Sequence, residues 1–320
     1  MRLCRFVHQD RPQVGIYSEK FITSLAGAAE AYAQATGDKV TLPAGDSLID
    51  LLAPGSEGLA AAKKVTEWVA SHSDMVPAEV RVATDGVQLL VPIPRPNKLI
   101  LLAGNYNEHI TEGGGKATAR AETFPYLFMK PPSTTLVDPG QPVVIPKVSP
   151  GSIDWELELG VVIGRKARHV PEADALKYVA GYTVVNDISD RKFRPNPGRK
   201  QRDKDSFFDW QHGKWHDSFC PCGPCITSAD AIPDPQKLGM KLSVGTSLKQ
   251  NATTGQQIFP VAAVVEFISH ICTLEPGDII ATGTPAGVGN ATGTYLKPGD
   301  KMEAWIEGIG TLVSPLVAEA

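Results

Sequence analysis

Apolar residues along the chain occur mostly in short runs separated by turn residues, which predicts many strands and few long helices. The runs with strand character fall at 3–7, 14–16, 21–25, 98–104, 142–146, 154–164, 181–188, 240–245, 247–251, 279–281, 301–306 and 310–317. Wider apolar spacing or helix-start signals predict helices at 28–36, 47–52, 58–71, 171–178 and 261–271. The mixture indicates an α+β protein rather than a helical bundle. The totals of 30 glycines and 26 prolines agree with this, because both residues favour turns.

A proline-rich segment at 91–96 (Val-Pro-Ile-Pro-Arg-Pro) is the best candidate for a domain boundary. Three prolines at alternate positions impose an extended, stiff connection. We therefore expect a small N-terminal α+β domain at 1–95 and a larger catalytic domain at 96–320. No pair of ionisable residues in the first part suggests chemistry.

Two acidic clusters stand in the central strands. Glu156 and Glu158 lie two residues apart at the head of an apolar run, so both side chains would project from one face of a strand. Asp187 closes a second strand-like run. Three converging carboxylates repel each other unless a cation lies between them, and oxygen ligands suit hard ions such as Mg²⁺, Ca²⁺ or Mn²⁺. The pattern predicts a divalent-metal site.

A histidine and a glutamate follow the strand at 98–104. His109 and Glu112 lie three residues apart, so one helical turn would bring them together, and Gly113 to Gly115 would end that turn and let it move. Such a pair suits acid–base work under a lid. A surface turn with a chance pairing is the alternative. Lys130, before a Pro-Pro corner, is either solvated or bound to an anionic substrate.

Composition excludes several classes of protein. The net charge of −4 leaves no basic footprint for nucleic acid. No apolar run approaches the roughly 18 residues that span a bilayer, and the N-terminus lacks the apolar core of a secretory signal. Five cysteines, an odd number, imply no disulfide framework, so we expect a cytoplasmic protein.

Residues 191–215 are polar and charged and read as one long loop, whose aromatic end we expect to pack near the site. Cys220, Cys222 and Cys225 follow it, with two histidines upstream. They raise the possibility of zinc, but no second cysteine cluster completes a site, and buried inert thiols are the favoured interpretation.

Six motifs occur in an order that resembles the fumarylacetoacetate hydrolase family. They are GNYNEH with a later Glu, FMKPPST, DWELELGVVIG, GYTVVNDIS, GKW followed by SFCPCGP, and LEPGDIIATGTPAGVG. The resemblance covers about 98–317 and implies that family's mixed β-roll, with an acylpyruvase-like activity and a homodimer. It also assigns roles by motif: the metal ligands Glu156, Glu158 and Asp187, the lid pair His109 and Glu112, the catalytic lysines Lys130 and Lys214, and Thr284 as an anchor for the substrate carboxylate.

Two further residues are expected to contact substrate. Tyr106 belongs to the first motif. Arg194 stands seven residues after Asp187, where the family often has glutamine, and this change suggests a more anionic contact. Cysteines at 220, 222 and 225 also depart from the small or apolar residues usual in that motif.

The expected substrate is a small 2-oxo acid bound to Mg²⁺ or Mn²⁺, with Ca²⁺ as a possible occupant of the site. We expect hydrolysis of a C–C bond in a 2,4-dioxo acid, giving pyruvate and a carboxylic acid. Two alternatives stay open on the same site, oxaloacetate decarboxylation and keto–enol isomerisation of a 2-hydroxy-diene-dioate. A non-catalytic metal-binding member is a third. No nucleic-acid or membrane partner is expected.

Overall fold

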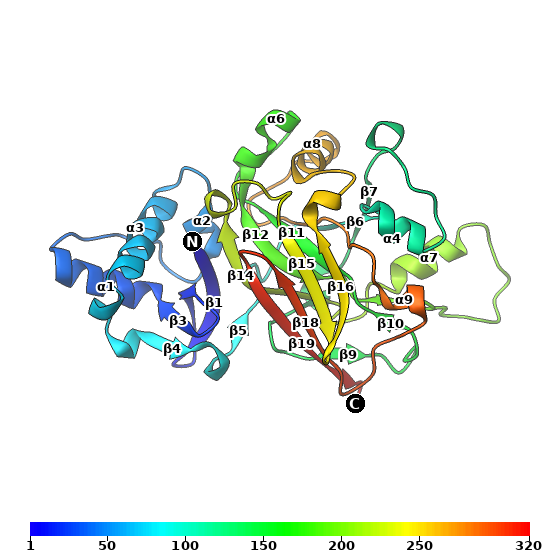
Figure 1. Cartoon of the computed structure of the whole chain (residues 1–320), viewed down its shortest axis with the longest axis horizontal. Coiled ribbons are helices and arrows are strands. Elements are labelled where there is room, and N and C mark those ends of the chain that lie inside the picture. The colour runs from blue at the N-terminus through cyan, green and yellow to red at the C-terminus, as the bar shows by residue number, and fades with distance from the viewer.

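The structure is a computed structural model that describes all 320 residues. Its largest element is a 12-stranded sheet that runs through the molecule (Figure 1). The strands along the sheet are β4 (Arg81–Ala83), β3 (Phe21–Ser24), β2 (Arg11–Tyr17), β1 (Arg2–His8), β14 (Cys220–Ser228), β12 (Val179–Asn186), β11 (Leu157–Ile163), β17 (Ile279–Ala281), β6 (Leu99–Ala103) and β7 (Tyr126–Met129). Two more pair from the side, β5 (Leu89–Leu90) with β1 and β8 (Leu136–Val137) with β14.

A second sheet of five strands lies in front of β11 and β12 in Figure 1. Its order is β16 (Ser247–Thr253), β15 (Gly239–Val244), β18 (Lys301–Ile306), β19 (Gly310–Ala318) and β9 (Val143–Ile145). Leu242 and Met302 from this sheet share one hydrophobic core with Leu159 of β11 and Val184 of β12. Every residue of β11 and β12 is buried, which explains why their sequences are mostly apolar, with Glu158, Thr183 and Asn186 as the polar exceptions. A two-stranded pair, β10 (Ile153–Asp154) with β13 (Ser189–Asp190), lies beside them.

The helices occupy the ends of this arrangement. In Figure 1 the N-terminal helices lie at one end and α4 and α7 at the other, with α6 and α8 along one edge. Their bounds are α1 (Leu25–Thr36), α2 (Leu48–Leu52), α3 (Glu57–Ser71), α4 (Asn107–Glu112), α5 (Pro132–Thr135), α6 (Glu172–Ala175), α7 (Asp205–His212), α8 (Val261–Ile271) and α9 (Gly289–Thr292). No helix combines the length and the apolar character needed to cross a membrane.

The N-terminal segment is joined to the rest of the chain through the large sheet. β1 pairs with β14 in antiparallel register, Leu3 opposite Ile226. A second hydrophobic core contains Leu25 and Trp68 together with Leu99 and Val185, and Ile93 of the proline-rich segment is buried in it. The division of the chain at about residue 95 stays a prediction, because the two parts share both a sheet and a core.

Most predicted elements are present, and the α+β class is confirmed. The hairpin at 240–251 turns at Gly245, as expected. The predicted helix at 171–178 divides into α6 and a 3₁₀ turn at Leu176–Tyr178. The prediction of a single long loop at 191–215 is wrong for the second half of this segment, which contains α7.

The start of α7 explains that difference. Arg199 donates to the Asp205 carboxylate at 3.0 Å, and Arg202 donates to the same group at 2.9 Å. Further along the helix, the Trp210 ring packs edge-on against Phe128, with centroids 5.0 Å apart. Arg199, Arg202 and Asp205, which the sequence pattern assigned to a polar loop, thus stabilise the start of α7. The contact between Trp210 and Phe128 holds the helix against the rest of the protein.

Candidate metal centre

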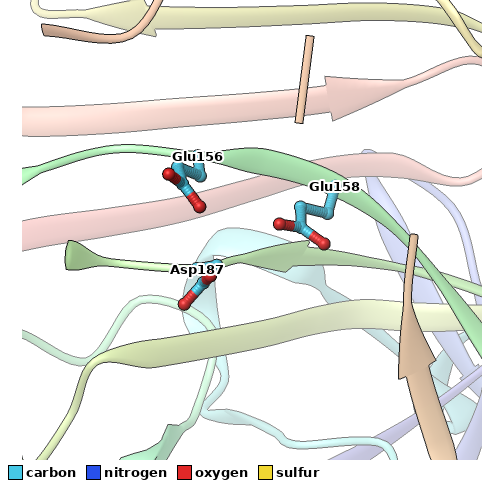
Figure 2. A group of neighbouring side chains, drawn as sticks. All are labelled: Glu156, Glu158 and Asp187. Atoms are coloured by element: carbon cyan, nitrogen blue, oxygen red, sulfur yellow. The ribbon is translucent and has the colours of Figure 1, made fainter. Parts of the chain in front are cut away.

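Glu156, Glu158 and Asp187 meet where β11 begins and β12 ends (Figure 2). The antiparallel register places Leu157 opposite Asn186. Glu156, one residue before Leu157, therefore faces Asp187, one residue after Asn186. The amide N–H of Asp187 donates to the Glu156 carbonyl at 2.9 Å, continuing the ladder. One carboxylate oxygen from each residue lies within 4.8 Å of the other two, and all three side chains are buried. The predicted convergence of these carboxylates is therefore present.

The donor set fits a divalent cation. Glu158 accepts a hydrogen bond from the Gly283 amide at 2.7 Å through Oε2, while its buried Oε1 has no partner. Burial, reinforced by the negative charges of Asp187 and Glu156, raises the pKa of Glu158 well above its ordinary value. A buried, unpartnered carboxylate oxygen is costly unless a cation or donor satisfies it. Three carboxylates with oxygen donors would hold Mg²⁺ or Mn²⁺.

Lys214 balances part of the negative charge. Its ammonium donates to Glu156 at 2.9 Å, to Asp187 at 2.5 Å and to the Ser189 hydroxyl at 2.9 Å. Burial would lower the pKa of Lys214, but the carboxylates of Asp187 and Glu156 raise it above its ordinary value. The lysine is therefore a buried cation fixed between two of the three candidate ligands.

Lys130 holds Asp187 from the other side. Its buried ammonium donates to the Asp187 carboxylate, to the Ile188 carbonyl at 2.9 Å and to the Phe219 carbonyl at 2.6 Å. An ammonium has three hydrogens, and each has a partner here. The sequence left open whether Lys130 is solvated or contacts substrate. In the structure it is buried and orients Asp187, a candidate metal ligand.

Arg191 is a site residue that sequence reasoning missed. Its Nε donates to Asp154 at 2.8 Å, and Nη2 lies 2.6 Å from Glu156 without the alignment of a hydrogen bond. Burial would raise the pKa of Glu156, but Arg191 and then Lys214 keep it well below its ordinary value. No local pattern in the sequence separates Arg191 from Arg194, and only the fold places Arg191 directly after β13, beside the carboxylates.

The predicted His109–Glu112 pair is formed. His109 Nδ1 and Glu112 Oε1 are 2.8 Å apart on α4, and Glu112 Oε2 accepts from the Gly287 amide at 2.8 Å. Asn105 holds the start of this turn, because its side chain bonds to Thr282 and Phe259 at 2.8 to 3.1 Å. Gly113 to Gly115 follow α4, as expected.

A cavity of about 230 Å³ brings the lid and the metal centre together. It is lined by Leu102, Ala103, Gly104, His109, Phe128, Glu156, Arg191, Trp210, Lys214 and Thr284. Trp210 comes from α7, so the aromatic end of the 191–215 segment does pack at the site.

Of the three residues predicted to contact substrate, only Thr284 lines this cavity. Its hydroxyl accepts a hydrogen bond from Gln250 at 2.8 Å, which leaves the hydroxyl hydrogen for another acceptor. Tyr106 is buried with its hydroxyl 3.4 Å from Met240 Sδ, outside the cavity. Arg194 is exposed and does not line the cavity either. Gln250, a second missed residue, also accepts from the Leu157 amide at 3.0 Å.

The cysteines on β14 form no metal site. Cys220, Cys222 and Cys225 are free and buried, and the only group of three or more potential ligands is the carboxylate triad. Burial raises the pKa of the Cys222 and Cys225 thiols to about 12. Such thiols are inert at neutral pH, as the favoured interpretation held.

Residues 98–317 match the model of the fumarylacetoacetate (FAA) hydrolase C-terminal domain, which is more than half of the chain. The chain belongs to the fumarylacetoacetate hydrolase family. The resemblance drawn from the six motifs is thereby confirmed.

Relatives in the fumarylacetoacetate hydrolase family carry several activities. The chain is 42% identical over 224 residues to 2,4-didehydro-3-deoxy-L-rhamnonate hydrolase of Sphingomonas sp. (strain SKA58), covering 69% of this chain and 73% of the relative. It is 31% identical over 321 residues to the mitochondrial oxaloacetate tautomerase Fahd2a of Rattus norvegicus, covering 99% and 92%. The crystal structure of maleylpyruvate hydrolase from Sphingobium sp. SYK-6, in complex with manganese(II) and pyruvate, superposes with a TM-score of 0.71 at 31% identity and full coverage of both chains.

Proposed function

We propose that this protein is a metal-dependent hydrolase that cleaves the C3–C4 bond of a 2,4-dioxo acid, giving pyruvate and a carboxylic acid. The observation that carries the proposal is that His109 of the acid–base pair and Glu156 of the carboxylate triad line the same small cavity, with Glu112 bonded to His109 and the other two carboxylates beside Glu156. The hydrolase names of two relatives, one of them crystallised with manganese and pyruvate, support it.

Glu156, Glu158 and Asp187 would hold Mg²⁺ or Mn²⁺. When bound, the cation supplies Lewis acidity toward the carboxylate and 2-oxo oxygens of the substrate. Lys130 and Lys214 keep the carboxylates in place through the hydrogen bonds described above. The positive charge of Lys214 also faces the cavity, where it offsets the negative charge that develops on the substrate.

Glu112 acts as the general base in this proposal. It removes a proton from a water molecule as that water adds to the C4 carbonyl, and the C3–C4 bond then breaks. The electron pair of that bond leaves with the pyruvate enolate. His109 is hydrogen-bonded to Glu112 and lines the cavity, so it relays the proton to the enolate carbon. One water is consumed, and a carboxylic acid and pyruvate are released.

Two residues would recognise the substrate carboxylate. Thr284 has a hydroxyl hydrogen available in the cavity, and Arg191 lines the cavity with a guanidinium whose Nη2 also lies 2.6 Å from Glu156. A buried guanidinium suits a carboxylate because its donors match the two oxygens. Arg191 therefore takes the anionic contact that the sequence placed on Arg194.

Keto–enol tautomerisation of oxaloacetate is the second candidate. The relative named for this activity covers 99% of the chain, including the N-terminal part. Tautomerisation needs only proton transfer between carbon and oxygen, which the same His109–Glu112 pair can perform without a nucleophilic water. Decarboxylation of oxaloacetate and isomerisation of a 2-hydroxy-diene-dioate use the same groups and belong in the same test.

The experiment is a substrate screen with purified protein in Mg²⁺ or Mn²⁺. Acylpyruvates, oxaloacetate and unsaturated 2-hydroxy dioates are compared by pyruvate release, CO₂ release and loss of enol absorbance. Hydrolysis predicts pyruvate release that EDTA and Glu158→Ala both abolish. Pyruvate release that survives both would overturn the proposal. Faster enol loss from oxaloacetate, without pyruvate release from any acylpyruvate, would favour the second candidate.

We also propose that the chain forms a homodimer. Met129, Phe208 and Trp215 are exposed apolar residues near α7, and the Trp215 indole donates to the Met129 carbonyl at 2.9 Å. Exposed apolar groups gathered in one place are typical of interaction surfaces. Light scattering coupled to size-exclusion chromatography tests this, and a monomer at micromolar concentration would contradict it.

A further inference from the structure

Gly287 stands between the lid and the strand that carries the metal ligands. Its amide N–H donates to Glu112 Oε2 at 2.8 Å. Its carbonyl accepts a hydrogen bond from the indole Nε1–H of Trp155 at 3.0 Å. Trp155 immediately precedes the ligand Glu156. Gly287 therefore connects two residues: its N–H binds Glu112, the proposed general base, and its carbonyl binds Trp155, the neighbour of a candidate metal ligand.

The rest of the 283–290 loop is fastened to the same stretch of chain. Asp154 accepts from the amides of Gly289 at 2.6 Å and Asn290 at 2.9 Å. At the other end, the Gly283 amide donates to Glu158. Residues 154, 155 and 158 thus each hold one part of the loop, and Trp155 holds the part that contacts the lid.

The backbone at Gly287 has little freedom to change. Its φ of +102° lies in the region that favours glycine, and an added Cβ would lie 2.2 Å from the Lys249 carbonyl oxygen. Because the loop passes so close to Lys249, a hydrogen bond to the Gly287 carbonyl helps to determine where the neighbouring N–H points. An indole N–H is a donor only, so Trp155 can donate a hydrogen bond to the Gly287 carbonyl but cannot accept one.

We propose that Trp155 is a positioning residue for the lid: its indole N–H orients the Gly287 loop so that the Gly287 amide holds Glu112 in the closed arrangement. Trp155 is buried and does not line the cavity that contains Glu156 and His109, so it acts through Gly287 rather than on substrate. The lid helix α4 follows Asn105, whose side chain is held by Thr282 and Phe259, and ends at the glycines 113–115. The Gly287 contact is the one that ties its catalytic carboxylate to the metal strand.

The activity readout of this inference rests on the proposed function, whereas the lid readout does not. Trp155→Phe keeps an aromatic ring and removes the N–H. Trp305→Phe is the matched control. Trp305 is a partly buried residue of β18 that does not line the cavity and does not contact Gly287. Lid closure is measured by limited proteolysis of the 113–118 segment with Mn²⁺ and oxalate, a non-reacting mimic of a 2-oxo acid. Mn²⁺ affinity is measured by calorimetry.

We expect Trp155→Phe to lower kcat by about 3- to 10-fold, the effect of losing one neutral hydrogen bond, and to weaken oxalate-dependent protection of the lid. Mn²⁺ affinity should stay within about 2-fold of wild type. On a Glu112→Ala background, the same change should have no further effect on kcat or protection.

Unchanged lid protection in Trp155→Phe would overturn the inference. An equal loss of protection in Trp305→Phe, or a parallel loss of Mn²⁺ binding, would also overturn it by showing a general structural defect. If no substrate in the screen is turned over, the proposed function fails, yet the proteolysis result still decides whether Trp155 positions the lid.

Discussion

Glu156 and Asp187 lie opposite each other across the β11–β12 pair, and the Asp187 amide donates to the Glu156 carbonyl at 2.9 Å. The separation of these two candidate ligands is therefore determined by backbone pairing. A slip of one residue in this register would turn one carboxylate to the opposite face. Because both strands are fully buried, such a slip is strongly disfavoured.

Glu158→Gln should remove the stabilisation that a divalent ion gives. At a Mn²⁺ concentration 100 times the dissociation constant, binding to the folded state adds about 2.7 kcal/mol to the free energy of unfolding. An uncharged amide at position 158 weakens the trio of carboxylates, so the same Mn²⁺ concentration should give little gain. Denaturant unfolding with and without Mn²⁺ measures this. The exposed Glu108→Gln is the control, and an undiminished gain in Glu158→Gln would contradict the assignment.

Lys130→Met should be strongly destabilising. The substitution leaves the buried Asp187 carboxylate and two carbonyls without their donor, and removing one partner of a buried ion pair costs about 3–5 kcal/mol. The free energy of unfolding in urea, with EDTA present, gives the measurement. Lys177→Met, at an exposed lysine paired with Asp174, should change it by less than about 0.5 kcal/mol. A loss below about 1 kcal/mol for Lys130→Met would disagree with the buried arrangement.

Glu112→Gln should abolish most turnover while leaving metal binding intact. The amide can keep the contacts to Gly287 and His109 but cannot accept a proton, and a general base contributes about 10²- to 10⁴-fold to the rate. Steady-state kinetics on the best substrate of the screen, together with Mn²⁺ calorimetry, test this. Glu122→Gln, an exposed residue of the same segment, is the control. Wild-type kcat in Glu112→Gln would exclude this residue as the base.

Asp205 should make the stability of the α7 segment depend on pH. Hydrogen bonds from Arg199 lower the pKa of Asp205 from 3.8 to about 2. A carboxyl with a depressed pKa in the folded state contributes stability that is present above its unfolded value and lost as pH falls through its folded value. The difference in melting temperature between wild type and Asp205→Asn should therefore be full above about pH 5 and shrink between about pH 4 and pH 2.

Asp203→Asn, at an exposed neighbouring aspartate, should follow wild type over the whole pH range. High salt should change the Asp205 effect less than pH does, because Asp205 is only 3% exposed and buried ion pairs are screened weakly. A difference between wild type and Asp205→Asn that does not change with pH would show that the carboxylate charge is not what holds the start of α7.

The elements near the site were predictable where one physical rule dominates. The alternate spacing of Glu156 and Glu158 and the three-residue spacing of His109 and Glu112 each follow from local geometry, and both pairs are formed as predicted. Substrate contacts were less predictable. Arg191 and Arg194 are both arginines in one polar segment, and no local pattern tells which enters the cavity. Burial against Asp154 and Glu156 decides for Arg191.

The amino-acid sequence by itself determined the Glu156–Glu158 pair and the lid pair, because these depend on residue identity and on spacings within single strands or turns, and the order of six motifs identified the family. Only the tertiary structure decided that Asp187 faces Glu156, that every donor of Lys130 is engaged, and that Gly287 joins Trp155 to Glu112. Each of these contacts joins residues 31 or more positions apart. Their partners are selected by sheet register and by the need to satisfy buried polar groups, which no local spacing records.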